Sequence, residues 1–176
     1  PRFRRVGVAD GLPSSTVFQV AQDRDGYLWI ASGDGLARFD GVDYRIFRHD
    51  PRDPDSLPGD VVQAVHVDRD NRVWVAAEGA GVAVLDVDRD GFERIPGTAG
   101  EDIWAIASDA QGAVWIGGYG TGVRRFDRGG DPLEPAAAAW RHDAAQPHSL
   151  ASDIVLALAA DAGGMWVATT AGVDHV

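Results

Sequence analysis

A Trp-centred motif recurs four times along this chain, and this recurrence constrains the fold more than any other feature of the sequence. The first copy covers residues 23–31 and 35–40 and reads as a polar turn, a short apolar strand, a glycine turn and a second strand. The tryptophans at the centres of the four copies are Trp29, Trp74, Trp115 and Trp166. Their spacings are therefore 45, 41 and 51 residues, and a period in this range indicates a repeat architecture.

Each copy predicts a small antiparallel sheet, as the first copy illustrates. Val17 to Ala21 is a short apolar strand, and Asp25-Gly26 after it is a strong hairpin signal because such a turn needs positive φ. Two further strands follow over Tyr27 to Ser32 and Leu36 to Phe39. Tyr44 to Phe47 then alternates with the two-residue period of a half-exposed fourth strand. Four strands in about 40 residues match one propeller blade.

We therefore predict an all-β fold, a β-propeller fragment with about four blades of four-stranded antiparallel sheet within one domain, residues 1–176. The predicted blades cover residues 10–50, 57–96, 100–142 and 150–176, and the last lacks its outer strand. Residues 1–9 are predicted to be a stray outer strand, centred on Phe3 to Val8. An open arc leaves apolar faces and strand edges at both ends. We expect self-association through these edges, with two arcs closing a ring of about eight blades.

Composition excludes several partners and chemistries. The formal net charge is -11, so phosphate backbones are repelled and nucleic acid is not an expected partner. There is no cysteine, which excludes disulfides and thiol chemistry. The five histidines form no metal-ligand cluster in sequence, and we predict neither a metal nor another cofactor.

The four copies share a longer consensus. It reads Leu-Pro-x-x-x-Val at the inner strand, Asp-x-x-Gly-x-apolar-Trp-apolar at the turn, and Gly-apolar-x-x-Phe-Asp after it, most clearly in Leu12 to Asp40 and His49 to Asp86. This pattern resembles the two-component regulator propeller repeats, which occur in sensory regions of bacterial histidine kinases, hybrid two-component proteins and diguanylate cyclases. The resemblance implies a propeller in the periplasm, as the sensor region of an inner-membrane protein. It also implies ligand sensing, often of saccharides, with a histidine kinase or diguanylate cyclase output domain in the full-length protein.

The repeated residues are explained better by structure than by chemistry. A tryptophan at one position in every blade is expected to pack between sheets, where a large flat side chain buries about 150–250 Å². Asp23-x-Asp25-Gly26 resembles the opening of a calcium loop, but the distal glutamate of such a loop is absent, so a hairpin turn is the favoured interpretation. His49 and His142 are 93 residues apart at equivalent linker positions, which favours structural capping over catalysis.

Propeller topology narrows the place where a ligand would bind. The inner strand of a blade begins on the face that carries the turn between the second and third strands, so linkers and glycine turns surround one mouth of the central channel. We predict that a small polar ligand binds there, with carboxylates accepting hydroxyl hydrogen bonds and Tyr119 offering an apolar surface. Trp104 is the best candidate for a channel-facing aromatic. The predicted ligand-binding residues are Asp10, Ser14, Asp34, Asp60, Glu78, Asp102, Trp104, Tyr119, Asp153 and Thr170.

Three functions remain open at this stage. The first is a non-catalytic, extracytoplasmic ligand-sensing module of a two-component protein. The second is a propeller enzyme of the streptogramin-lyase type, which is disfavoured because no histidine lies on the predicted channel face. The third is a protein-interaction or dimerisation scaffold without a ligand, and the fold alone does not separate these functions.

Overall fold

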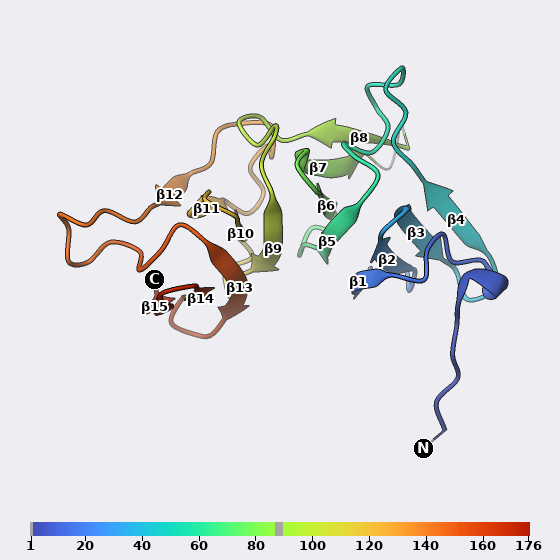
Figure 1. Ribbon diagram of the computed structural model, residues 1–176, viewed down its shortest axis with the longest axis horizontal. Coiled ribbons are helices and arrows are strands. Elements are labelled where there is room, and N and C mark those ends of the chain that lie inside the picture. The colour runs from blue at the N-terminus through green and yellow to red at the C-terminus, as the bar shows by residue number, and fades with distance from the viewer. Residues whose placement is uncertain (1, 87–89) are drawn as a thin grey trace.

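The computed structural model describes residues 2–86 and 90–176, and over these ranges the chain is all-β (Figure 1). Four antiparallel sheets are present, preceded by a single 3-10 turn, η1, at Val8–Asp10. The strands are β1 (Val17–Gln22), β2 (Leu28–Ser32), β3 (Gly35–Phe39), β4 (Tyr44–Phe47), β5 (Val62–Val67), β6 (Val73–Ala77), β7 (Gly81–Asp86), β8 (Gly91–Arg94), β9 (Ile103–Ser108), β10 (Val114–Gly118), β11 (Val123–Phe126), β12 (Ala138–Trp140), β13 (Val155–Ala160), β14 (Met165–Thr169) and β15 (Gly172–His175). The predicted fold class is confirmed.

Each sheet is a simple meander in which consecutive strands pair, with orders β1-β2-β3-β4, β5-β6-β7-β8, β9-β10-β11-β12 and β13-β14-β15. The sheets lie inside the four predicted blade ranges, and the fourth has three strands, as expected from its truncated repeat. Among the described residues no helix has the length and apolar character of a membrane span.

The four sheets, referred to below as blades 1 to 4, form an open arc around a common centre (Figure 1). The inner strands β1, β5, β9 and β13 contact one another in that order along the inside of the arc. One hydrogen bond recurs between neighbouring blades: the N–H of a glycine at or just before the third strand donates to a carbonyl of the linker into the next blade. The pairs are Gly35 with Asp60 (2.7 Å), Gly81 with Glu101 (3.0 Å) and Gly122 with Asp153 (3.0 Å).

The apolar cores lie between blades, because each sheet has two apolar faces. The tryptophan face of blade 1, with Trp29 and Leu36, packs on Val65, Val75 and Phe92 of blade 2. The same arrangement joins blade 2 to blade 3 and blade 3 to blade 4. The expected packing role is confirmed for the first three repeat tryptophans, whose exposed fractions are 1%, 0% and 4% for Trp29, Trp74 and Trp115.

Trp166 departs from this expectation. It occupies the equivalent position in β14, where it pairs with Ala159 of β13 and His175 of β15. Its exposed fraction is nevertheless 43%, because none of the described residues forms a further blade against the tryptophan face of blade 4.

The predicted strand over Phe3 to Val8 is wrong. Residues 2–7 belong to no strand, Val8 opens the 3-10 turn, and Phe3 is fully exposed. A strand needs a neighbouring edge for its backbone groups, and this segment extends away from the sheets at the N-terminal end of the arc (Figure 1).

The long linkers between blades 1 and 2 and between blades 3 and 4 close in the same way. The Nδ1–H of His49 donates to the carbonyl of Leu57 (2.7 Å), and the Nδ1–H of His142 donates to that of Leu150 (2.8 Å). A serine hydroxyl in each loop accepts from the backbone N–H that follows the histidine. These contacts support the structural interpretation of the repeated histidine.

Candidate functional site

All four inner strands carry a β-bulge at the same place near their start. In blade 1, Val17 pairs with Ser32 and Gln19 with Ala31, which leaves Phe18 as the extra residue of β1. The registers of the other three blades shift at the equivalent point, so the four bulged residues are Phe18, Gln63, Trp104 and Leu156. A bulge breaks the two-residue alternation of a strand and redirects the side chain of the extra residue.

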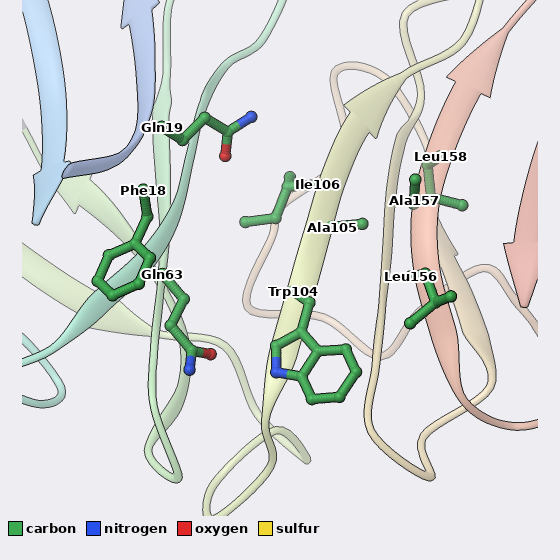
Figure 2. A pocket seen from close by; sticks show the side chains of 9 residues that line it. All are labelled: Phe18, Gln19, Gln63, Trp104, Ala105, Ile106, Leu156, Ala157 and Leu158. Carbon is green, nitrogen blue, oxygen red and sulfur yellow. The ribbon is translucent and has the colours of Figure 1, made fainter. Parts of the chain in front are cut away.

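The four bulged residues line one hollow on the inner side of the arc. Its volume is about 300 Å³, and Figure 2 shows its walls in β1, β5, β9 and β13. The nine lining residues carry no charge and comprise two aromatic rings, two amides and five aliphatic side chains. They are Phe18, Gln19, Gln63, Trp104, Ala105, Ile106, Leu156, Ala157 and Leu158. We call this hollow the channel pocket.

The two amides of the channel pocket differ in their partners. The Oε1 of Gln19 accepts a hydrogen bond from the N–H of Val65 (3.0 Å), so its carbonyl is used to tie β1 to β5. The Oε1 of Gln63 is buried and has no hydrogen-bond partner among the described residues. A buried acceptor without a partner is rare in folded proteins, which makes this oxygen a candidate contact for a bound molecule.

The structure brings three of the predicted site residues together beside this pocket. The N–H of Tyr119 donates to the carbonyl of Asp102 (2.8 Å), which places the β10–β11 turn next to the entry of β9. The rings of Trp104 and Tyr119 then lie 5.7 Å apart between centroids, with an interplanar angle of 47°. Tyr119 is exposed, so it extends the aromatic wall of the channel pocket toward the mouth of the channel.

Equivalent turns of the other blades lie on the same face. Glu78 donates its N–H to Val61 (2.9 Å) and Thr170 donates to Ile154 (3.2 Å), in each case across from the start of an inner strand. The hydroxyl groups of Thr170 and Ser152 are 3.0 Å apart. Ser14 lies at the corresponding entry of blade 1, where its Oγ accepts the N–H of Thr16 (3.1 Å).

Most of the predicted carboxylates on this face already have partners. Asp34 forms an ion pair with Arg48 (2.9 Å), and the hydrogen bond from this guanidinium lowers the pKa of the Asp34 carboxyl. Asp102 accepts a hydrogen bond from the N–H of Gly79 in the preceding blade. Asp153 accepts from the N–H of His142 (2.7 Å). These side chains hold linkers and turns together, and none of them lines the channel pocket.

Asp10 is not near the other predicted residues. It ends the 3-10 turn η1 and lines a separate hollow with Arg4, Phe39 and Tyr44. The β3–β4 turn, which contributes Gly41 and Val42 to this hollow, lies at the opposite end of blade 1 from the β2–β3 turn. Leu12 is buried against Ile30 and Ala37 on the face of blade 1 that lies opposite Trp29. This contact fixes the direction of the segment before Leu12 and places Asp10 away from the channel.

Sequence reasoning missed three of the four bulged residues, and the aspartate that supports each tryptophan. Aligning the four inner strands provides a signal for the bulged residues. Positions 18, 63, 104 and 156 change from phenylalanine to glutamine, tryptophan and leucine, whereas the preceding positions are always valine or isoleucine.

The aspartate at the start of every turn has one structural role. One oxygen of Asp68 accepts the backbone N–H groups of Asp70 (2.9 Å) and Arg72 (2.8 Å), and the other accepts the indole N–H of Trp74 (2.9 Å). The same indole bond is made by Asp23 (2.8 Å), Asp109 (2.8 Å) and Asp161 (2.7 Å) with their own tryptophans. The hairpin interpretation accounts for these carboxylates, and no cluster of metal-ligating side chains occurs within residues 2–86 and 90–176.

These hydrogen bonds also control ionisation. Burial alone raises the pKa of Asp68, but the bonds donated by the Trp74 indole and by Arg72 outweigh it, so the pKa is lowered overall. The same balance lowers the pKa of Asp109. In blade 4 the indole N–H of Trp166 is the main cause of a pKa of about 2 for Asp161.

The sequence and the fold both match known proteins. A family model described as "Two component regulator propeller" matches residues 11–34, 56–79 and 97–120. Histidine kinase P4 of Formosa agariphila is 41% identical to this chain over 54 residues, which cover 31% of this chain and 4% of that protein.

Two solved structures share the fold over nearly the whole chain. The extracellular domain of BT3049 from B. thetaiotaomicron, assigned to a hybrid two-component system, aligns with a TM-score of 0.75 and 20% identity over 98% of this chain and 26% of its own. The extracellular domain of BT4673 from the same organism, assigned to a one-component system, aligns with a TM-score of 0.75 and 19% identity over 93% of this chain and 22% of its own. This chain therefore spans about a quarter of those structures. Three segments of the chain, one in each of the first three repeats, match the two-component regulator propeller repeat.

Proposed function

We propose that this chain is a non-catalytic ligand-sensing region of an extracytoplasmic, periplasmic signalling protein, and that it binds a small uncharged polar molecule in the channel pocket. Binding shifts the population of propeller conformations and thereby biases an output domain, a histidine kinase or a diguanylate cyclase, in the full-length protein. The extracellular location of the two similar solved domains supports the placement outside the cytoplasm.

The observation that carries this proposal is the coincidence of four bulges with one pocket. Each inner strand breaks its regular alternation at the same point, and each break places its side chain on the wall of the channel pocket.

The lining defines the chemistry of the ligand. A charged molecule would lose its hydration in a pocket whose nine lining residues offer no opposite charge. A neutral ring with hydroxyl groups fits better, because its flat face can stack on the Trp104 indole while the Gln63 side chain, which lines the pocket, turns its buried, unpaired Oε1 toward a hydroxyl. Neutral saccharides have both features.

A thermal-shift and calorimetric screen tests the proposal. The ligands are neutral mono- and disaccharides, each paired with the uronic acid of the same ring as a charged control. At a ligand concentration of one hundred times Kd, we expect a stabilisation of about 2.7 kcal/mol for a neutral sugar that binds. Gln63→Leu and Trp104→Ala should each weaken that binding about tenfold or more, equivalent to about 1.4 kcal/mol.

Gln22→Leu is the matched control, because Gln22 lies at the far end of β1 and donates to the Gly26 carbonyl instead of lining the pocket. It should leave the affinity unchanged. Tyr119→Ala should weaken binding less than Trp104→Ala, since Tyr119 stands outside the lining. Binding that survives both pocket variants, or a panel in which no neutral sugar stabilises the chain, would refute the proposed ligand class.

A further inference from the structure

A second hollow, of about 370 Å³, lies between blades 1 and 2. Its walls come from the tryptophan face of blade 1, the facing side of blade 2, and the β1–β2 and β5–β6 turns. Both walls are therefore faces that pack on a neighbouring blade of this chain. None of the residues that line this hollow lines the channel pocket. We call it the inter-blade pocket.

The inter-blade pocket contains an arginine without a carboxylate partner. Arg38 in β3 is opposite Trp29 in β2, so the two side chains share the face toward blade 2. The Cζ of Arg38 lies 4.7 Å from the ring centroid of Tyr27 and 5.7 Å from that of Trp29. Arg38 is half-buried, and within residues 2–86 and 90–176 its guanidinium forms neither an ion pair nor a hydrogen bond. The N–H donors in the guanidinium plane are thus available to an anion.

The equivalent arginine of blade 3 is paired within the chain. Arg125 is opposite the repeat tryptophan of its own blade, as Arg38 is. Its guanidinium forms ion pairs with Asp127 (2.8 Å) and Asp109 (3.6 Å). The same position in the repeat can therefore be neutralised internally, and blade 1 does not do so.

The two carboxylates of blade 1 that correspond to these partners are occupied. Asp40 accepts two backbone N–H groups of its own turn (2.7 and 2.8 Å). These bonds are the main causes of the lowered pKa of Asp40, and the charge of Arg38 is the smallest. Asp23 accepts the backbone N–H of Tyr27 (2.9 Å) and the indole N–H of Trp29 (2.8 Å). The charge of Arg38 is left for a molecule from solution.

The opposite charge stands at the edge of the same pocket. Asp25, in the β1–β2 turn, is exposed, and the side-chain partner of its carboxylate is the neutral amide of Asn71 (3.4 Å). Asp70 and Arg72, the other charged residues that blade 2 contributes, have ion-pair partners within the chain. The pocket therefore presents one unpaired cation, Arg38, and one unpaired anion, Asp25.

The corresponding space between blades 2 and 3 is filled. Gly112 occupies the place in the blade 3 turn that Asn71 occupies in the blade 2 turn. A Cβ on Gly112 would lie 2.7 Å from the Cδ of Arg128 and 3.0 Å from that of Arg69, so these two long side chains take up the room there. The inter-blade pocket is thus a property of the first interface and does not follow from the repeat geometry.

We propose that the inter-blade pocket binds a free α-amino acid with an apolar side chain. The carboxylate pairs with the Arg38 guanidinium, and the ammonium group lies toward Asp25. The side chain packs on the Tyr27 ring and on Leu85 of blade 2. A zwitterion satisfies both unpaired charges, whereas a simple anion would be repelled by the aspartates of the pocket and a simple cation by its arginines.

Calorimetry and thermal shift with L-leucine and L-phenylalanine on the 176-residue chain test this proposal. We expect at least one of them to bind and to raise the unfolding temperature. Leucinamide and phenylalaninamide lack the carboxylate, and the N-acetyl amino acids lack the ammonium group, so each should bind at least tenfold more weakly than its parent. If neither amino acid binds at millimolar concentration, or if the derivatives bind as well as their parents, the proposal is wrong.

Variants of the two charges locate the site. Arg38→Gln and Asp25→Asn should each lower the affinity about tenfold or more. Asp25 is exposed, so its variant should fold even if loss of the Arg38 contacts with the rings disturbs blade 1. Arg125→Gln is the matched control, because it removes the equivalent arginine outside the pocket, and it should leave the affinity unchanged. Unchanged affinity in Asp25→Asn and in folded Arg38→Gln would refute the assignment.

Two further measurements separate this site from the channel pocket. Trp104→Ala should leave the affinity for the amino acid unchanged, because Trp104 lines only the channel pocket. The indole N–H resonance of Trp29 should shift during the amino acid titration, since Arg38 lies over that ring. Loss of amino acid binding in Trp104→Ala, with the Trp29 resonance unmoved, would place the amino acid in the channel and overturn the proposal. The saccharide screen has no bearing on this result.

Discussion

Gln63 is expected to lower the stability of the ligand-free chain and to strengthen the binding of the proposed ligand. Its buried Oε1 has no partner in the described part of the chain, and an unsatisfied buried acceptor costs about 1–3 kcal/mol. Replacement by leucine, a side chain of similar size, removes the unsatisfied oxygen and keeps the packing.

Gln63→Leu should therefore leave the ligand-free chain as stable as before or more stable, by up to about 1–3 kcal/mol, although it weakens binding. Chemical denaturation of the ligand-free variant measures this, with Gln19→Leu as a comparison that loses the bond to Val65 and should be less stable. A destabilised Gln63→Leu would show that the amide has a partner in solution and that its oxygen is not free for a ligand.

The aspartate and tryptophan of each repeat act as a pair. In blade 2, Asp68 is the acceptor for a fully buried indole N–H, so Asp68→Ala should lower the free energy of unfolding by about 1–3 kcal/mol. Trp74→Phe removes the same donor. A double-mutant cycle should give a total smaller than the sum of the two single effects, and additive effects would show that the bond contributes nothing to stability.

The same pair gives blade 4 a defined response to acid. The folded pKa of Asp161 lies at about 2, below the unfolded value near 3.8, chiefly because of the bond from the Trp166 indole. The ionised carboxylate therefore stabilises the fold above pH of about 4, and this contribution disappears as the pH falls through about 2.

Asp161→Asn should thus be less stable than the parent chain at neutral pH, and the difference between the two should shrink between pH of about 4 and 2. Urea denaturation at several pH values measures it. A difference that stays constant over that window would mean that the carboxylate does not titrate in the way the structure implies.

At the scale of single elements, the third strand of a blade depends on glycine where it begins. Gly81 has a φ of 85°, and a Cβ there would lie 2.2 Å from the carbonyl oxygen of Thr98. Gly79, in the same turn, has a φ of 61° but open space around the Cβ position. The two positions therefore share an unfavourable φ. They differ in that an added Cβ would collide with the Thr98 carbonyl at Gly81 and with nothing at Gly79.

Gly79→Ala should cost about 1 kcal/mol from the backbone conformation alone. Gly81→Ala should cost clearly more, about 2–3 kcal/mol or above, because the backbone has to move and the bond to Glu101 (3.0 Å) is disturbed. Thermal unfolding of both variants tests this difference. Equal losses would contradict the close packing of the β6–β7 turn against the next linker.

The strands themselves were predictable, and the bulges within them were not. Turn signals such as Asp25-Gly26 and the spacing of the tryptophans fix the meanders, because they act over a few residues. The bulge at Gln63 depends on how β5 and β6 pack against the neighbouring blade, which is not a local property of the sequence. The sequence from Val62 to Val67 by itself predicts an ordinary strand. The side chains that line the channel pocket were for this reason largely missed, except Trp104.

At the scale of the whole molecule, periodicity predicted the blades, their order and the face on which linkers and turns meet. Periodicity failed where a segment has no neighbouring strand or blade to pack against. Phe3 to Val8 has the composition of a strand but pairs with no strand edge among the described residues. Trp166 has the position of a core residue, but no other described blade covers it. The predicted carboxylates, such as Asp34 and Asp153, lie between linkers and turns because those segments need ionic and hydrogen-bond partners of their own.

The indole N–H resonances of the six tryptophans, followed by NMR during a titration with a neutral saccharide, test the central claim most directly. The account predicts that the Trp104 resonance moves with the ligand concentration, whereas those of Trp29, Trp74 and Trp115, which are buried between blades and bonded to aspartate, stay in place. A saccharide that binds while Trp104 stays unchanged and a tryptophan between blades shifts would contradict a site in the channel pocket.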